Sequence, residues 1–225
     1  MGRDGSRTFA WMLAALCPVV MMMASFIFDH WTWGLMDDPK MLVWWTGPWI
    51  ERVGKIVSDQ WQNGTLRWTN ALSIATFYDL FRDAPKLFYV FRMMIVLGAL
   101  LLWGGSAALL TGRRLALVLV PAIAFSFYFF YDTFFYLSSH ELLGMFFGGL
   151  AMFLLSKGMV LPVSQGQPLR PWISLGALFA VAACTLSKEV FVAVPLAVGV
   201  GLFVHAFPTR RKDVATAGAV MFLAV

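Results

Sequence analysis

Charged residues are scarce in this 225-residue sequence, where Asp, Glu, Lys and Arg make up 13% of the chain. Soluble domains carry roughly 25% charged residues, and 60% of this chain is apolar. Because so few charges cannot cover the surface of a soluble protein, the sequence indicates a lipid environment. There the backbone polar groups must be satisfied by helices or by closed barrels. Barrel strands alternate apolar and polar residues, whereas the apolar residues here form long unbroken runs, which predict helices.

Cysteine is also scarce. Cys17 and Cys184 both fall inside predicted helices, where a thiol behaves as a small packed side chain. The two cysteines therefore do not identify a redox compartment.

Seven apolar runs divide the chain, and the sequence predicts an all-α, polytopic transmembrane helix bundle of about seven helices. Each of the longer runs can cross a hydrocarbon core. A cleaved signal peptide is the alternative for the first run, which is long for one and lacks a clear cleavage site. The runs are 9–28, 87–110, 115–131, 142–156, 172–186, 190–207 and one that opens near 214 and continues to 225. Because the last run has no polar tail, we expect 1–225 to be a single transmembrane domain that is incomplete at its C-terminus; a short last helix that ends at the membrane face is the alternative.

Basic residues gather in alternate short connections, and this asymmetry predicts the orientation. Cytoplasmic loops carry the excess of Lys and Arg, so we expect a multi-pass integral membrane protein with a cytoplasmic N-terminus, in a bacterial inner or plasma membrane. The asymmetry also explains the net charge of +5 without nucleic acid as a partner. The basic residues on this side are Arg3, Arg7, Arg113, Arg114, Lys157, Arg170, Arg210, Arg211 and Lys212.

The first outer connection, 29–86, is much longer than the others and is expected to be functional or separately folded. Seven of the ten tryptophans lie in it, between Trp31 and Trp68. Tryptophan prefers the membrane–water interface, so this extracytoplasmic loop is expected to lie along the membrane surface. An amphipathic pattern predicts an interfacial helix over 49–61, with Arg52 on its polar side, and a weaker pattern covers 72–81.

An acidic pair, Asp37-Asp38, stands in this loop just before Pro39. Two adjacent carboxylates repel each other unless they are solvated, bound to a cation or paired with a basic group. One interpretation is a general base or a divalent-metal ligand at the membrane face. The other is an ordinary solvated turn, which Asp-Asp-Pro also fits.

Basic and acidic residues recur on the predicted outer side at three further positions. Arg67 follows an Asn-Gly turn and suits a phosphate or carboxylate, although an interfacial arginine can also extend to lipid headgroups. His140 and Glu141 open the fourth apolar run, where they could cap a helix or face a cavity. Lys188-Glu189 occupies a short turn, either as a surface hairpin or as a pair that lines a cavity.

The order of these motifs resembles the multi-pass glycosyltransferases of structural class C, which use lipid-linked sugar donors and include the protein mannosyltransferases. The resemblance rests on the acidic pair after the first helix, the long outer loop, the Gly-x-x-Arg element at 64–67, and the turns 139–141 and 187–189. It covers nearly the whole chain as the N-terminal portion of a typical member. The resemblance implies that Asp37 or Asp38 is catalytic.

The chemistry implied by this resemblance is transfer of a sugar from a polyprenyl phosphate to a glycan, lipid or protein acceptor. Asp37 or Asp38 would take the proton of the acceptor hydroxyl. Asp38 is the candidate ligand for a divalent cation, Mg or Mn, and no organic cofactor is expected. Arg67 and Lys188 would stabilise the leaving phosphate. The remaining candidate substrate-binding residues are His140, Glu141 and Glu189.

Two other classes of function remain open from the sequence. A transporter or flippase of lipid-linked substrates would also place charges near the membrane, but such proteins usually contain internal repeats and matched broken helices. No repeat relates the first three runs to the next three, and Pro121 and Pro195 do not form a matched pair. A non-catalytic membrane scaffold is the third possibility. Transfer of a labelled sugar, as opposed to movement of the intact lipid, would distinguish the enzyme from the flippase.

Overall fold

The structure is a computed structural model that describes residues 47–65, 67–81, 83–126, 140–168 and 171–187, with short pieces inside 10–25 and 192–219. These residues are helical, with no strand among them, which confirms the predicted all-α class. The continuous elements are α3 (Trp49–Gln62), α4 (Trp68–Phe81), α5 (Pro85–Thr111), α6 (Ala116–Ser126), α8 (His140–Leu155), the π-helix η1 (Ser156–Val160), α9 (Leu161–Ser164) and α10 (Pro171–Thr185).

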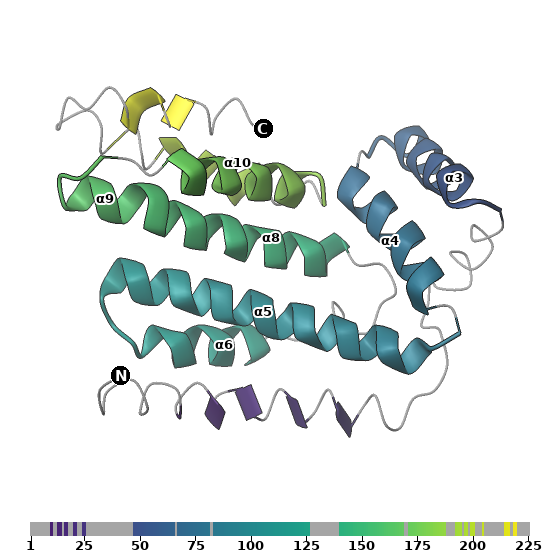
Figure 1. The fold of residues 1–225 in the computed structure, drawn as a ribbon, viewed down its shortest axis with the longest axis horizontal. Helices are drawn as coiled ribbons and strands as arrows, with labels where there is room; N and C mark the ends of the chain where they lie inside the picture. Colours follow the sequence, from purple (N-terminus) through teal and green to yellow (C-terminus); the bar gives the residue numbers. More distant parts are fainter. Residues whose placement is uncertain are drawn as a thin grey trace.

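The helices form an elongated bundle with a small helical pair at one end (Figure 1). Helices α5, α8 and α10 run lengthwise and pack side by side, and α6 folds back along α5. Helices α3 and α4 contact each other and lie across the end where α5 and α8 begin and α10 ends. We call this the α4 end of the bundle.

Among the residues that the structure describes, two helices are long and apolar enough to cross a membrane, judged by length and composition. They are Lys86–Thr111, within α5, and Glu141–Val160, formed by α8 and η1; the apolar helix Trp172–Thr185 is shorter. The predicted runs 9–28 and 190–207 and the run that opens near 214 lie mostly outside the described residues. A count of seven spans therefore stays a prediction.

Local sequence explains where α5 begins and ends. Pro85 occupies the first turn, where its missing N–H costs nothing and its fixed φ suits a helix. At the other end Gly112 adopts the left-handed conformation, with φ of 67°, that terminates helices. The 27 residues between these signals extend for roughly 40 Å.

Glycines allow α5 and α8 to approach closely. The indole ring of Trp103 on α5 lies against Gly148 and Gly149 on α8, where a Cβ atom at Gly149 would stand 2.9 Å from Trp103 Cδ1. Trp103 Nε1 donates a hydrogen bond to the carbonyl of Met145 at 2.9 Å. The polar atom of this large side chain is therefore satisfied inside the bundle.

Pro162 explains why a π-helix follows α8. Proline has no N–H to donate to residue 158, and its ring would clash with that carbonyl in a regular α-helix. The N–H of Leu161 instead donates to the carbonyl of Ser156, five residues earlier. This wider turn carries the helix through the proline to Ser164, beyond the predicted end at 156.

Candidate functional site

The predicted site residues divide between described and undescribed parts of the chain. Arg67 directly precedes α4, and Glu141 lies in the first turn of α8, both half-buried. The backbone of His140 begins α8. The remaining candidates lie outside the described residues: Asp37, Asp38, Lys188 and Glu189.

The first turn of α4 contacts the last turn of α10. The N–H of Thr69 donates to the carbonyl of Leu186 at 3.2 Å. The Thr69 hydroxyl donates to the carbonyl of Ala183 at 3.0 Å. The last carbonyls of a helix have no backbone partner within it, and Thr69 donates to two carbonyls at this end, one of which, that of Ala183, also accepts the hydroxyl of Ser187. This contact lies two residues after Arg67 on one side and two residues before Lys188 on the other.

The second turn of α8 contacts the same end of α10. Cys184 Sγ lies 3.3 Å from the carbonyl of Gly144, its hydrogen-bond acceptor. Glu141 is one turn before Gly144 and is therefore on the α4 end as well (Figure 1). The structure thus brings together, at one end of the bundle, the chain segments that hold Arg67, Glu141 and the described part of the Ser-Lys-Glu turn, Ser187.

The backbone of Arg67 is held between α3 and α4. Its N–H donates to Gln60 Oε1 at 3.1 Å, and its carbonyl accepts the N–H of Ala71 at 3.0 Å. Gly64, with φ of 69°, makes the turn out of α3. Arg67 therefore starts α4 from a defined position.

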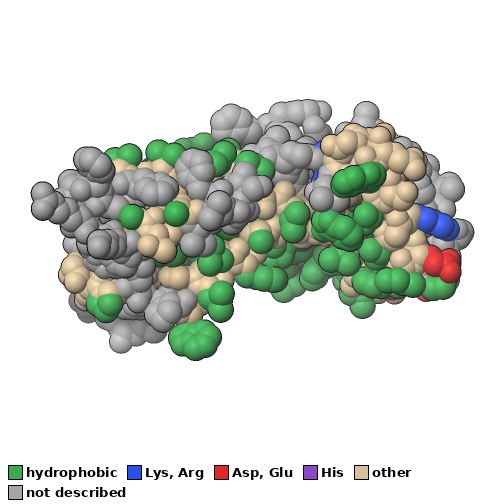
Figure 2. Space-filling model, turned by 90° about the horizontal axis from the view of Figure 1, so that it is seen from above, with side chains coloured by type: hydrophobic (Ala, Val, Ile, Leu, Met, Phe, Trp, Pro, Cys, Tyr) green, Lys and Arg blue, Asp and Glu red, His purple; other side chains and the backbone are tan. Residues whose placement is uncertain are grey.

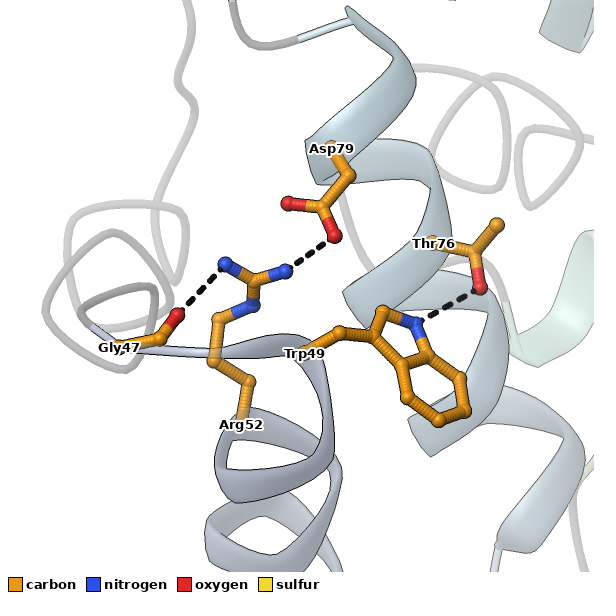
Figure 3. Close-up of polar contacts among 5 residues, drawn as sticks. All are labelled: Gly47, Trp49, Arg52, Thr76 and Asp79. Carbon is orange, nitrogen blue, oxygen red and sulfur yellow. Dashed lines mark hydrogen bonds and ion pairs between the residues drawn. The ribbon is translucent and has the colours of Figure 1, made fainter.

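A second polar cluster joins α3 to α4 (Figure 3). The guanidinium of Arg52 forms an ion pair with Asp79 and donates a hydrogen bond to the carbonyl of Gly47 at 2.9 Å. Trp49 Nε1 donates to Thr76 Oγ1 at 3.2 Å. The sequence predicts Arg52 away from the apolar face of α3, and in the structure its side chain is nevertheless buried, with only 6% exposed. Its partner on α4 cannot be recognised from the pattern of α3 alone.

Arg92 is a buried cation that the sequence analysis does not single out. It lies in the second turn of α5 and is 0% exposed, with its guanidinium carbon 5.3 Å from the centre of the Phe88 ring. Charged residues inside apolar spans are costly and usually functional. The single arginine inside the apolar run 87–110 is the signal that could have identified it.

Asn70 is a second buried polar residue at the α4 end. It is 4% exposed, and its Oδ1 has no hydrogen-bond partner among the residues that the structure describes. The neighbouring Ala71 and Ile74 pack with Phe88 of α5 and Leu142 of α8. The first turn of α4 thus carries a buried acceptor into the contact between three helices.

The opposite end of the bundle carries basic residues. Arg113 and Arg114 are exposed in the turn between α5 and α6, and Lys157 is exposed in η1 with Nζ 4.8 Å from the centre of the Phe153 ring. The described part of the predicted basic side is therefore separated from Arg67 and Glu141 by the length of the bundle (Figure 1). On the part of the bundle that Figure 2 describes, the coloured side chains between these ends are hydrophobic, and the few charged side chains in view lie mainly at the α3 end.

Within the described residues, no three His, Cys, Asp or Glu side chains lie close enough to hold a metal ion. The candidate ligand Asp38 lies outside them.

Comparisons with known proteins do not assign this chain to a family. No protein-family model, no curated protein and no solved structure matches the chain.

Proposed function

We propose that this chain is a polytopic membrane glycosyltransferase that takes its sugar from a polyprenyl phosphate. The observation that carries the proposal is the meeting of three chain segments at the α4 end of the bundle. These segments hold Arg67 at the start of α4, Glu141 in the first turn of α8, and Ser187, directly before Lys188-Glu189. A transferase needs cations and carboxylates together at the membrane face, where the phosphate of its donor lies.

Apolar exposure supports a membrane setting. In the most apolar 18-residue stretch of Lys86–Thr111, only 28% of the residues are buried inside the bundle. The outward side chains of the helices are large and apolar, including Met94 on α5, Ile123 on α6 and Phe179 on α10. Water would penalise this surface by about 25 cal/mol per Å², whereas lipid does not.

The proposed reaction is displacement at the anomeric carbon of the donor. Asp37 or Asp38 takes the proton of the acceptor hydroxyl. The acceptor oxygen then bonds to the anomeric carbon as the bond between that carbon and the phosphate oxygen breaks. Arg67 and Lys188 stabilise the negative charge that develops on the phosphate. Glu141, Glu189 and His140 orient these cations or the acceptor. Asp38 is the candidate ligand for Mg or Mn.

Membranes that contain the protein, incubated with a radiolabelled polyprenyl-phosphate sugar, test this function. We expect label in an acceptor, and we expect Asp37→Asn or Asp38→Asn to abolish transfer without loss of folded protein. Asp83→Asn, at an exposed carboxylate in the turn before α5, is the control and should retain activity. Near-normal transfer by both Asp37→Asn and Asp38→Asn would refute the catalytic assignment. Movement of the intact lipid without transfer would support a flippase instead.

A further inference from the structure

Thr69 joins two segments that lie 114 residues apart in the chain. Both of its hydrogen-bond donors, the N–H and the hydroxyl, are used on carbonyls at the C-terminal end of α10. The positive N-terminal end of the α4 dipole therefore meets the negative C-terminal end of α10, which is a favourable arrangement. The contact fixes where α4 begins relative to α10.

Arg67 is two residues before this contact, and its backbone has little independent freedom. Gln60 on α3 accepts its N–H, and Ala71 on α4 donates to its carbonyl. A shift of the first turn of α4 away from α10 would therefore move Arg67 with it. Lys188, the other proposed phosphate ligand, follows Leu186 by two residues.

From these contacts we propose that Thr69 is a positioning residue that holds Arg67 at the C-terminal end of α10, where its guanidinium binds the phosphate of a polyprenyl-phosphate ligand. This inference rests on the proposed function for the identity of the ligand. Thr69 touches no reacting atom in this arrangement, and its effect on binding passes through Arg67.

The structure separates this role from general support of the fold. The α3–α4 pair is already held by the Arg52–Asp79 ion pair and by the packing of Ile56 and Ile74 against Phe88. In Thr69→Val, the carbonyl of Ala183 still accepts the hydroxyl of Ser187 at 2.7 Å. Loss of the Thr69 hydroxyl should therefore leave no unsatisfied carbonyl and should change stability little.

Binding of a polyprenyl phosphate without a sugar, measured with the purified protein in lipid nanodiscs, tests the inference without requiring transfer. We expect Thr69→Val to raise the Kd about fivefold, the equivalent of one hydrogen bond. Thr69→Ser, which retains the hydroxyl, should restore wild-type binding. The matched control is Thr76→Val, the same substitution on the same helix, which removes the acceptor of Trp49. It should leave the Kd unchanged.

A double-mutant cycle shows whether Thr69 acts through Arg67. In the Arg67→Ala background, Thr69→Val should weaken binding no further, because the guanidinium that it positions is gone. A full fivefold loss in that background would overturn the inference, as would equal effects of Thr69→Val and Thr76→Val. Wild-type protein that does not bind the ligand would also overturn it. If the wild type binds without transferring a sugar, the transferase function fails while the role of Thr69 stands.

Discussion

Arg52 and Asp79 form an ion pair across α3 and α4 in which the two partners differ in exposure. The Arg52 side chain is 7% exposed, whereas that of Asp79 is 44% exposed. Water that reaches Asp79 therefore screens the attraction between the two charges. Loss of Asp79 would leave a cation that has little access to solvent.

We expect Asp79→Asn to lower the free energy of unfolding by about 1 kcal/mol, because the guanidinium of Arg52 loses its charged partner. Thermal unfolding in detergent measures the change, and Asp83→Asn is the control for loss of an exposed carboxylate on the same segment. Because salt screens the wild-type ion pair, the difference between Asp79→Asn and the wild type should shrink at high ionic strength. A larger difference in high salt would contradict this account.

Substitution by alanine should lower the stability of the protein at Gly149 and raise it at Gly54. A Cβ atom at Gly149 would lie 2.9 Å from Trp103 Cδ1 and 3.1 Å from Leu102 Cβ, whereas one at Gly54 would meet nothing within 4 Å. Gly149→Ala should destabilise by about 1–3 kcal/mol through overpacking. Gly54→Ala, at an exposed position of α3, should stabilise by about 0.5–1 kcal/mol. If the unfolding midpoints of the two variants shifted in the same direction, the described packing around Gly149 and Gly54 would be wrong.

The sequence predicts the helices of this fold better than it predicts their contacts. Helix α3 is recovered almost residue for residue, because a strong amphipathic period is a local property. Helix α4 begins at Trp68, four residues before the predicted start at 72. Thr69 and Asn70 resemble turn residues in the local sequence, and the hydrogen bonds of Thr69 to the end of α10 cannot be read from that sequence. Tertiary hydrogen bonds outweigh local propensity at this point.

The candidate site is predicted in part. The sequence predicts Arg67 and Glu141 on one side of a membrane, and the structure brings their segments to one end of the bundle. Arg92 is overlooked because one cation barely alters the hydropathy of a 24-residue run. Its burial depends on packing from other helices, which no local pattern records. The catalytic assignment of Asp37 and Asp38 stays a prediction.

Arg92→Ala should be the most destabilising arginine substitution in the described helices. Removal of a fully buried side chain leaves a cavity and strands the groups that contact the guanidinium, a loss of about 3 kcal/mol. Arg113→Ala, at an exposed position, should change stability by no more than about 0.5 kcal/mol. Equal unfolding midpoints for the two variants would contradict the buried position of Arg92.

Asn70→Leu should leave the unfolding midpoint unchanged or raise it. The leucine side chain has a similar branched shape, and it replaces a buried Oδ1 that has no partner among the described residues. An unsatisfied buried acceptor costs about 1–3 kcal/mol, so its removal should offset the imperfect fit. A clear loss of stability would show that the carboxamide has a partner that holds the fold.

The orientation of the bundle can be tested at two exposed positions near opposite ends of the bundle. Ser58 lies on α3 at the α4 end, and Arg113 follows α5 at the other end. In a Cys17→Ser background, where the remaining Cys184 is buried, a membrane-impermeant thiol reagent should label Ser58→Cys in intact cells. It should label Arg113→Cys only after permeabilisation, because we expect α5 to cross the hydrocarbon core and its basic turn to lie in the cytoplasm. The reverse pattern would invert the orientation and place Arg67 on the cytoplasmic face. Labelling of both cysteines in intact cells would mean that α5 does not span the membrane.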